Sequence, residues 1–156
     1  MGANNLEYGR RAGRDEYVFS YPIGASEVFK KKGGAFLKDD SSGRLEIVSS
    51  QTNIIGHALF NEDFTASSTE GGTPMMVNID PDGVFELPIN TGTWAATMRG
   101  KVCDLTVASS IQGVDLTAST VDQVELIDKG FTNAAGTVVS VLVKLWQSTL
   151  TRTGVV

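Results

Sequence analysis

The sequence of 156 residues has one cysteine, Cys103, and one histidine, His57. A single cysteine cannot form an internal disulfide, which argues against a secreted scaffold held by disulfide bridges. A catalytic triad or a histidine and cysteine metal cluster would have to use His57, whose neighbours Ile55 and Ala58 are not the partners that such sites need. We expect His57 to be a packed or edge residue and Cys103 to be a half-buried strand residue, with a reactive thiol as the alternative.

Long apolar runs are also missing from the chain. The longest nearly uncharged apolar stretch, residues 137–143, is far shorter than the roughly 20 residues of a membrane-spanning helix. Residues 1–14 are polar and rich in arginine, without the apolar segment of a signal peptide. We therefore expect a soluble protein made in the cytoplasm, with no membrane partner.

Motifs for catalysis or metal binding are few. The run Asp80-Pro-Asp-Gly83 resembles the start of a calcium loop, but it lacks the later oxygen ligands and the closing glutamate. A calcium ion at a subunit junction stays open as an alternative, with ligands from Asp39, Asp40 or Asp82. The carboxylates Glu62, Asp63 and Glu70 could in principle serve glycoside hydrolysis, but nothing beside them marks a sugar cleft. We expect no enzyme activity, no cofactor and no metal.

Charge is unevenly distributed over the sequence, whose net charge is −5. Residues 1–44 hold eight basic and six acidic residues, whereas residues 45–156 hold five basic and twelve acidic residues. An acidic body repels phosphate backbones, so we expect no nucleic-acid partner. A mildly basic arm on an acidic body is better suited to binding an acidic protein surface or another copy of the chain.

Helical periodicity is nearly absent, and only residues 94–99 and 118–123 could form a helical turn or two. Short β-rich runs alternate with turn signals about every 8–12 residues, a spacing typical of sandwiches and barrels. We predict an all-β fold: a single β-sandwich or β-barrel-like domain of short antiparallel strands over residues 15–146. An extended, flexible N-terminal arm (residues 1–14) precedes this domain, and a C-terminal tail or edge strand (residues 147–156) follows it.

Four parts of the sequence carry predictions of local structure. Residues 75–89 are interpreted as a β-hairpin in which Gly83 takes a positive φ. Gly56 indicates a β-bulge or a close approach of two backbones. Residues 61–73 form a long polar loop, functional or mobile. Residues 137–146 are rich in β-branched side chains and are predicted to form a central strand.

Candidate partner-binding residues lie in the N-terminal arm and in the following lysine run. They are assigned to contact a larger assembly or a neighbouring subunit, and they are Leu6, Tyr8, Arg10, Arg11, Arg14, Lys30, Lys31 and Lys32. Two simpler interpretations stay open, namely a chain end with no role and a solvated strand end whose lysines block edge-to-edge pairing.

Short motifs over about residues 33–146 resemble a known family. In the first half they are Gly34-Ala-Phe-Leu37, Leu45-Glu-Ile-Val48 and the run from Asn53 to Phe60 with its Ile-Gly-His-Ala-Leu. In the second half they are Cys103-Asp-Leu105, the run Gln112-Gly-Val-Asp-Leu-Thr-Ala-Ser119 and the closing strand at Val138–Leu145. These motifs resemble the small β-barrel module of the capsid decoration (cement) proteins of tailed bacteriophages.

The resemblance implies a structural virion protein on the exterior of an icosahedral capsid, made in the host cytoplasm. Such proteins bridge subunits of the phage major capsid protein and work as homo-oligomers, with a trimer favoured and a dimer possible. Three alternatives stay open: another virion β-domain of the tail, neck or fibre, a carbohydrate- or ligand-binding β-module that uses residues 61–73, and an uncharacterised hydrolase.

Overall fold

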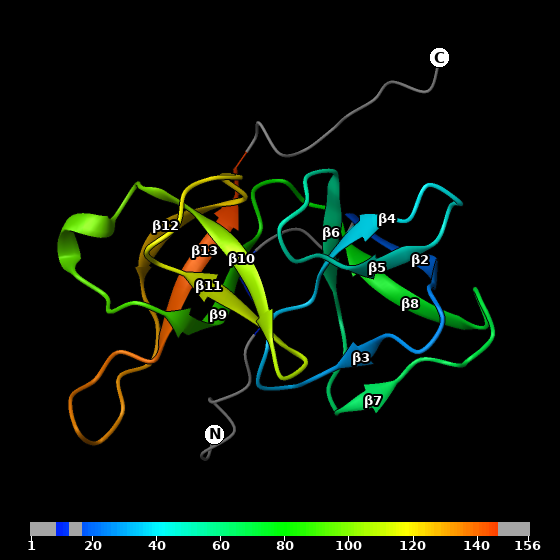
Figure 1. Cartoon of the computed structure of the whole chain (residues 1–156), viewed down its shortest axis with the longest axis horizontal. Coiled ribbons are helices and arrows are strands. Elements are labelled where there is room, and N and C mark those ends of the chain that lie inside the picture. Colours follow the sequence, from blue (N-terminus) through cyan, green and yellow to red (C-terminus); the bar gives the residue numbers. More distant parts are fainter. Residues whose placement is uncertain (1–8, 13–16, 147–156) are drawn as a thin grey trace.

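The strands form two groups that lie side by side in the computed structural model, which describes residues 9–12 and 17–146 (Figure 1). The first group, here called the N-terminal barrel, closes through five strands in the order β2-β5-β4-β6-β8. Its strands are β2 Val18–Ile23, β4 Phe36–Asp39, β5 Leu45–Ile47, β6 Ile54–Ala58 and β8 Thr73–Asn78. A two-stranded sheet is attached to it, formed by β3 Val28–Phe29 and β7 Phe64–Thr65.

The second group is a six-stranded sheet in the order β1-β9-β11-β10-β12-β13. Because β9 also pairs with β13, the five strands from β9 to β13 return to their start, and we call them the C-terminal ring. Its strands are β9 Val84–Thr91, β10 Val102–Ala108, β11 Ile111–Asp115, β12 Val124–Lys129 and β13 Ser140–Leu145, with β1 Gly9–Ala12 added on β9. A short 3-10 turn, η3 Ala96–Met98, lies between β9 and β10.

The all-β prediction is confirmed, and most neighbouring strands are antiparallel as expected. Two pairings are parallel, β2 with β5 and β9 with β11. In both cases other strands intervene in the sequence, which supplies the crossover that a parallel pair requires. The segment predicted as a central strand is paired on both edges, since β13 lies between β12 and β9.

The predicted hairpin at residues 75–89 is wrong. Strand β8 pairs with β2 and β6 in the barrel, whereas β9 pairs only within the second sheet. The turn between them is real, since the Gly83 N–H donates to the Asp80 carbonyl at 3.1 Å, but it carries the chain from one group to the other. Gly83 does not adopt a positive φ, and its missing side chain instead makes room for Phe85, whose ring would lie 2.9 Å from a Cβ there.

The flexible arm predicted for residues 1–14 needs a correction at residues 9–12. These residues form β1, an antiparallel strand on β9. Residues 1–8, 13–16 and 147–156 lie outside the described residues, so the rest of the predicted arm and the predicted tail are not placed.

Gly56 confirms the close approach that its position suggested. A Cβ on Gly56 would lie 2.2 Å from the carbonyl oxygen of Asn78 on β8, so only glycine fits. The register between β4 and β6 shifts at the same place, because Leu37 faces Gly56 while Lys38 faces Ile54. The extra residue, Ile55, is the bulge expected there.

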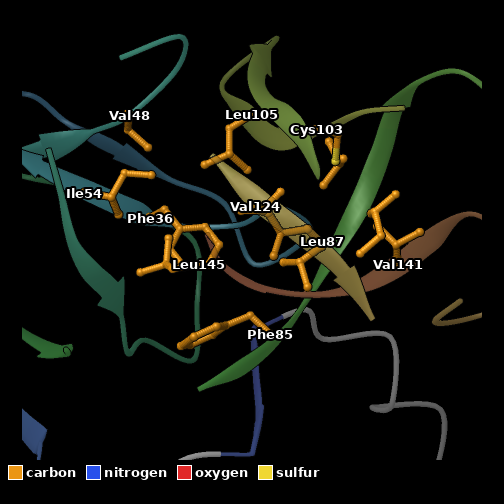
Figure 2. Close-up of a cluster of buried hydrophobic side chains, with 13 residues drawn as sticks. Phe36, Val48, Ile54, Phe85, Leu87, Cys103, Leu105, Val124, Val141 and Leu145 are labelled. Carbon is orange, nitrogen blue, oxygen red and sulfur yellow. The ribbon is translucent and has the colours of Figure 1, made fainter. Parts of the chain in front are cut away.

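One apolar cluster extends across the two groups of strands. It combines residues of the ring with Phe36, Val48 and Ile54 of the N-terminal barrel (Figure 2). A second cluster fills the N-terminal barrel alone, around Ile23, Leu37 and Val77. Burying apolar surface is the main stabilising contribution to a fold, so the shared cluster binds barrel and ring to each other.

Two buried glutamines reinforce this junction. Gln112 on β11 accepts a hydrogen bond from the Phe36 N–H at 2.8 Å and donates to the carbonyls of Phe36 and Val48 at 3.0 and 2.7 Å. Gln123 accepts from the Leu105 N–H at 2.7 Å and donates to the carbonyls of Ser49 and Gln51 at 2.7 and 2.6 Å. Each side chain from the second group therefore holds backbone of the first.

Candidate interaction surface

His57 is a buried structural residue, as its sequence context predicted. Its Nε2 atom accepts a hydrogen bond from the Ala35 N–H at 2.9 Å, so the proton lies on Nδ1, which donates to the Ala58 carbonyl at 2.7 Å. The imidazole stacks on Phe85 with 4.5 Å between ring centroids and meets Phe36 edge-on. Burial lowers the pKa of His57 to about 4, so the ring is neutral near pH 7.

Cys103 is buried more deeply than expected, at 2% exposure. Burial first, and then the nearby carboxylates of Asp104, Asp115 and Asp122, raise the pKa of its thiol to about 12. The thiol therefore stays protonated, and a protonated thiol is a poor nucleophile. A small cavity of about 150 Å³ lies beside it, with Met98, Leu116 and Leu126 among its lining residues.

Two carboxylates of residues 61–73, those of Asp63 and Glu70, hold the segment in place. Asp63 accepts a hydrogen bond from the Lys31 N–H at 2.7 Å and lies 3.5 Å from the Lys30 ammonium. Glu70 accepts from the Ala25 N–H at 3.2 Å and pairs with Arg44 at 3.4 Å. The hydrogen bond from the Lys31 N–H, and to a smaller extent the charge of Lys30, lower the pKa of Asp63.

The segment at residues 61–73 is also more structured than a long loop. It contains β7, and the N–H groups of Ala66 and Gly71 donate to the carbonyls of Glu27 and Ile23 at 2.8 and 3.1 Å. Phe64 stacks on the buried Phe29, with 4.7 Å between ring centroids. Residues 61–73 are therefore packed on β3 and its flanks.

Other acidic residues cap turns. The Asp104 carboxylate accepts hydrogen bonds from the N–H groups of Thr120, Val121 and Asp122 at 3.0, 2.9 and 2.8 Å. Asp80 accepts from the Asp82 N–H at 3.0 Å, which makes this run a turn. Within residues 9–12 and 17–146 the structure shows no group of three or more histidine, cysteine or acidic side chains that could hold a metal ion.

The lysine run forms a tight turn after β3. The Gly33 N–H donates to the Lys30 carbonyl at 2.8 Å, and Gly34 then bonds to the Gln112 carbonyl on β11 at 2.7 Å. Asp63 accepts from the backbone of Lys31 and pairs with the side chain of Lys30. Lys32 is exposed and forms no ion pair with the part of the chain that the structure describes.

The arm candidates are only partly placed. Arg10 and Arg11 lie on β1, where Arg10 faces Phe85 of β9. Leu6, Tyr8 and Arg14 lie outside the described residues. The structure therefore puts Arg10 and Arg11 on the second sheet and the lysine turn on the N-terminal barrel, in two different places.

Exposed apolar side chains were not identified from the sequence. Phe19 and Met76 of the N-terminal barrel are 48% and 47% exposed, and Val107, Phe131 and Trp146 are 38–40% exposed. Phe131 begins a hairpin that projects from the ring on the side away from the N-terminal barrel (Figure 1). Asn133 orders its tip by accepting from the N–H groups of Ala135 and Thr137. The sequence signal that could have pointed to Phe131 is the run from Gly130 to Val143, which contains no charged residue.

Comparison with known proteins identifies no relative of this chain. No protein-family model, no curated protein and no solved structure matches this chain. Among the described residues, no helix is long and apolar enough to cross a membrane.

Proposed function

We propose that this chain is a structural, non-enzymatic protein that binds the outside of an icosahedral phage capsid as an oligomer. It stabilises the shell by bridging subunits of the major capsid protein. The resemblance over about residues 33–146 is the reason for proposing a capsid as the partner. The most direct structural support is the junction between barrel and ring, which is built for rigidity.

The rigid junction supports a bridging role for a physical reason. Gln112 and Gln123 use buried side-chain amides to hold backbone of the opposite group, and an apolar cluster spans the same junction. A rigid body loses little conformational freedom when it binds two neighbouring subunits. Many small copies then add their binding energies across the lattice.

The energetic mechanism is selective binding. A protein that binds the assembled shell and not the free subunits stabilises the shell in proportion to the number of bound copies. The surface carries Lys32 without an ion pair among the described residues, and an acidic patch on the capsid would suit this lysine.

Binding to capsids tests the proposal. Purified protein is mixed with shells of the cognate major capsid protein before and after expansion, and co-sedimentation is measured. We expect binding to expanded shells and a higher temperature of shell disruption. Electron microscopy of labelled particles should then show signal over the whole capsid, whereas signal at a single vertex would indicate a tail or neck protein instead.

A matched pair of variants tests the lysine turn. Lys32→Glu should weaken capsid binding about tenfold through the loss of one charge contact and the gain of a repulsive one. Lys129→Glu makes the same charge change at an exposed site at the end of β12 and should bind as the parent does. Equal binding by both variants would remove the lysine turn from the interface.

The ligand-binding alternative has no supporting observation in residues 61–73. The carboxylates of Asp63 and Glu70 bind the protein's own backbone and basic side chains. Binding of purified protein to a glycan array would nevertheless favour this alternative over the capsid proposal.

A further inference from the structure

The connection from β9 to β10 forms a flap, defined here as residues 92–100. It begins and ends at glycines with positive φ, Gly92 at 91° and Gly100 at 76°, and it contains η3, which buries none of its residues. The flap lies on the side of the ring away from the N-terminal barrel (Figure 1). Its side chains Trp94 and Met98 are partly buried and pack against the apolar cluster of the ring.

The flap is attached to β12 at its second end. The Arg99 guanidinium pairs with Asp128 at 2.8 Å, and the Gly100 N–H donates to the Leu126 carbonyl at 2.8 Å. Since Arg99 and Asp128 are each about half exposed, water screens their attraction and the ion pair contributes little. The flap can therefore adjust its position, and with it the position of Met98, at a low cost in free energy.

A pocket of about 150 Å³ lies beside the flap, between β10, β12 and the segment that follows β11. Most of its lining is apolar or sulfur-containing, and these residues are Met98, Val102, Cys103, Leu116, Ala118 and Leu126. Cys103 and Leu126 are each 2% exposed and form its buried floor. An apolar cavity of about 150 Å³ is large enough to hold a molecule of the size of benzene.

The lining of the pocket disfavours ions. A charged group would lose its hydration against the apolar floor. Burial first, and then the carboxylates of Asp104, Asp115 and Asp122, raise the pKa of the Cys103 thiol to about 12, and the same carboxylates repel an anion placed beside the thiol. A cation would meet the ammonium of Lys101, which is exposed and also lines the pocket. The ligand that fits is therefore uncharged.

Two sulfur atoms favour an aromatic ligand among uncharged ones. The thioether of Met98 and the thiol of Cys103 both line the pocket. Contacts between a thioether sulfur and an aromatic ring are favourable, and the flexible side chain of methionine adapts to the shape of its neighbour. An aromatic ring therefore fits this lining better than a saturated one.

The surface around the pocket is polar. Lys101, Thr117 and Ser119 are exposed, and none of the large apolar side chains exposed among the described residues lines the pocket. A protein partner would need an apolar surface around the pocket, because the centre of a protein interface is apolar. A free small molecule is the occupant that this polar surround favours.

We propose that this pocket binds one free, uncharged aromatic molecule of about the size of phenol, between Met98 of the flap and the floor of Cys103 and Leu126. The hydroxyl groups of Thr117 and Ser119 are the hydrogen-bond partners available to a hydroxyl group on the ligand. The inference goes beyond the proposed function, because it holds whether or not a capsid is bound.

Titration of the full chain, followed by two-dimensional amide NMR, tests the proposal. Phenol at pH 7 should give saturable shifts at residues 98–103, 116–119 and 126, with a dissociation constant on the order of a millimolar. Benzoate and benzylammonium carry the same ring with opposite charges, and cyclohexanol carries a saturated ring, so each should bind about tenfold more weakly or worse. Shifts that do not saturate or that lie elsewhere, or equal binding of any of these three probes, would overturn the proposal.

A matched pair of substitutions locates the ligand. Ala118→Leu places a larger apolar side chain in the pocket and should weaken phenol binding about tenfold or more, whereas Ala108→Leu at the exposed end of β10 should bind as the parent does. Nuclear Overhauser effects from phenol to the methyl groups of Met98 and Leu126 in the parent do not depend on either variant. Equal binding by the two folded variants, or no such effects at saturation, would refute the site, while failure to bind capsids would leave it standing.

Discussion

At the residue scale, single buried polar side chains are satisfied by backbone groups. His57 bonds to Ala35 and Ala58, and Gln112 and Gln123 each bond to three backbone groups. A buried polar group without a partner costs about 1–3 kcal/mol, so each of these side chains fixes the segments around it. The consequence is that polar residues, as well as the apolar core, specify how barrel and ring fit together.

The buried histidine predicts a loss of stability in acid. In the unfolded chain His57 binds a proton near pH 6.5, whereas in the folded protein its pKa is about 4. The unfolded state therefore gains protons first as the pH falls, and the free energy of unfolding decreases between pH 6.5 and 4 by up to roughly 3 kcal/mol. Urea denaturation at several pH values measures this loss.

A His57→Gln variant provides the comparison for the acid prediction. It should be less stable than the parent at pH 7, and its stability should fall less steeply between pH 6.5 and 4. Parallel slopes for the two proteins would show that His57 does not cause the acid sensitivity.

Gln112 gives a second prediction at this scale. Gln112→Ala leaves the Phe36 N–H and the Val48 carbonyl without the side-chain partner that they have in the parent. We expect the free energy of unfolding to fall by about 2–4 kcal/mol. Gln51→Ala removes an exposed glutamine side chain with one hydrogen bond to Ser49, and it should cost less than about 1 kcal/mol. Chemical denaturation of both variants checks the difference.

At the scale of elements, residues 61–73 show how side chains can order a polar segment. The segment has few apolar residues, but it is fixed to β3 and its flanks by backbone hydrogen bonds and by the carboxylates of Asp63 and Glu70. These partners are about 30 to 45 residues away in the sequence. Sequence reasoning identified the length and polarity of the segment but not its order.

Asp63 predicts a local effect on dynamics. Asp63→Ala removes the acceptor of the Lys31 N–H and the ion pair with Lys30, so hydrogen exchange should become faster at residues 30–33 and 61–66. The neighbouring Glu62 is exposed and forms no hydrogen bond or ion pair with the described residues, so Glu62→Ala should leave exchange unchanged. Exchange measured by mass spectrometry would contradict this account if both variants behaved alike.

At the scale of the whole molecule, the barrel and the ring share one apolar cluster. Phe36 of β4 packs with Phe85 of β9 at 5.1 Å between ring centroids, and Val48 and Ile54 join the same cluster (Figure 2). Gly34 tightens the contact, because a Cβ there would lie 2.7 Å from Leu87. Neither group of strands can be separated from the other without exposing this cluster to water.

The shared cluster predicts a single unfolding transition. Calorimetry should give one peak whose calorimetric and van't Hoff enthalpies agree, because the barrel and the ring lose their common core together. Gly34→Ala should lower the midpoint of that single transition, while Gly24→Ala, whose Cβ would meet only ordinary contacts of 3.7 Å or more, should have little effect. Two resolved transitions in the parent would show that the barrel and the ring unfold independently.

The candidate surface could be read only in part from the sequence. The lysine run predicts an exposed lysine such as Lys32. The hydrogen bond and the ion pair that Asp63 forms with Lys31 and Lys30 could not be predicted, because Asp63 lies more than thirty residues further along the chain. Phe131 was missed because an exposed phenylalanine beside a strand has the same local pattern as a buried one. Exposure is decided by the neighbours that the fold supplies.

Local chemistry determined the all-β class of this protein. Turn residues, β-branched runs and the glycine at position 56 act over a few residues, so the sequence by itself indicated the all-β class and the bulge, but not β1 or β7. Only the tertiary structure decided that β8 and β9 belong to different groups of strands, since a turn sequence does not state where its two flanking strands pair. It also decided that Gln112 and Gln123 join barrel and ring, because such bonds depend on segments about 65 to 75 residues apart.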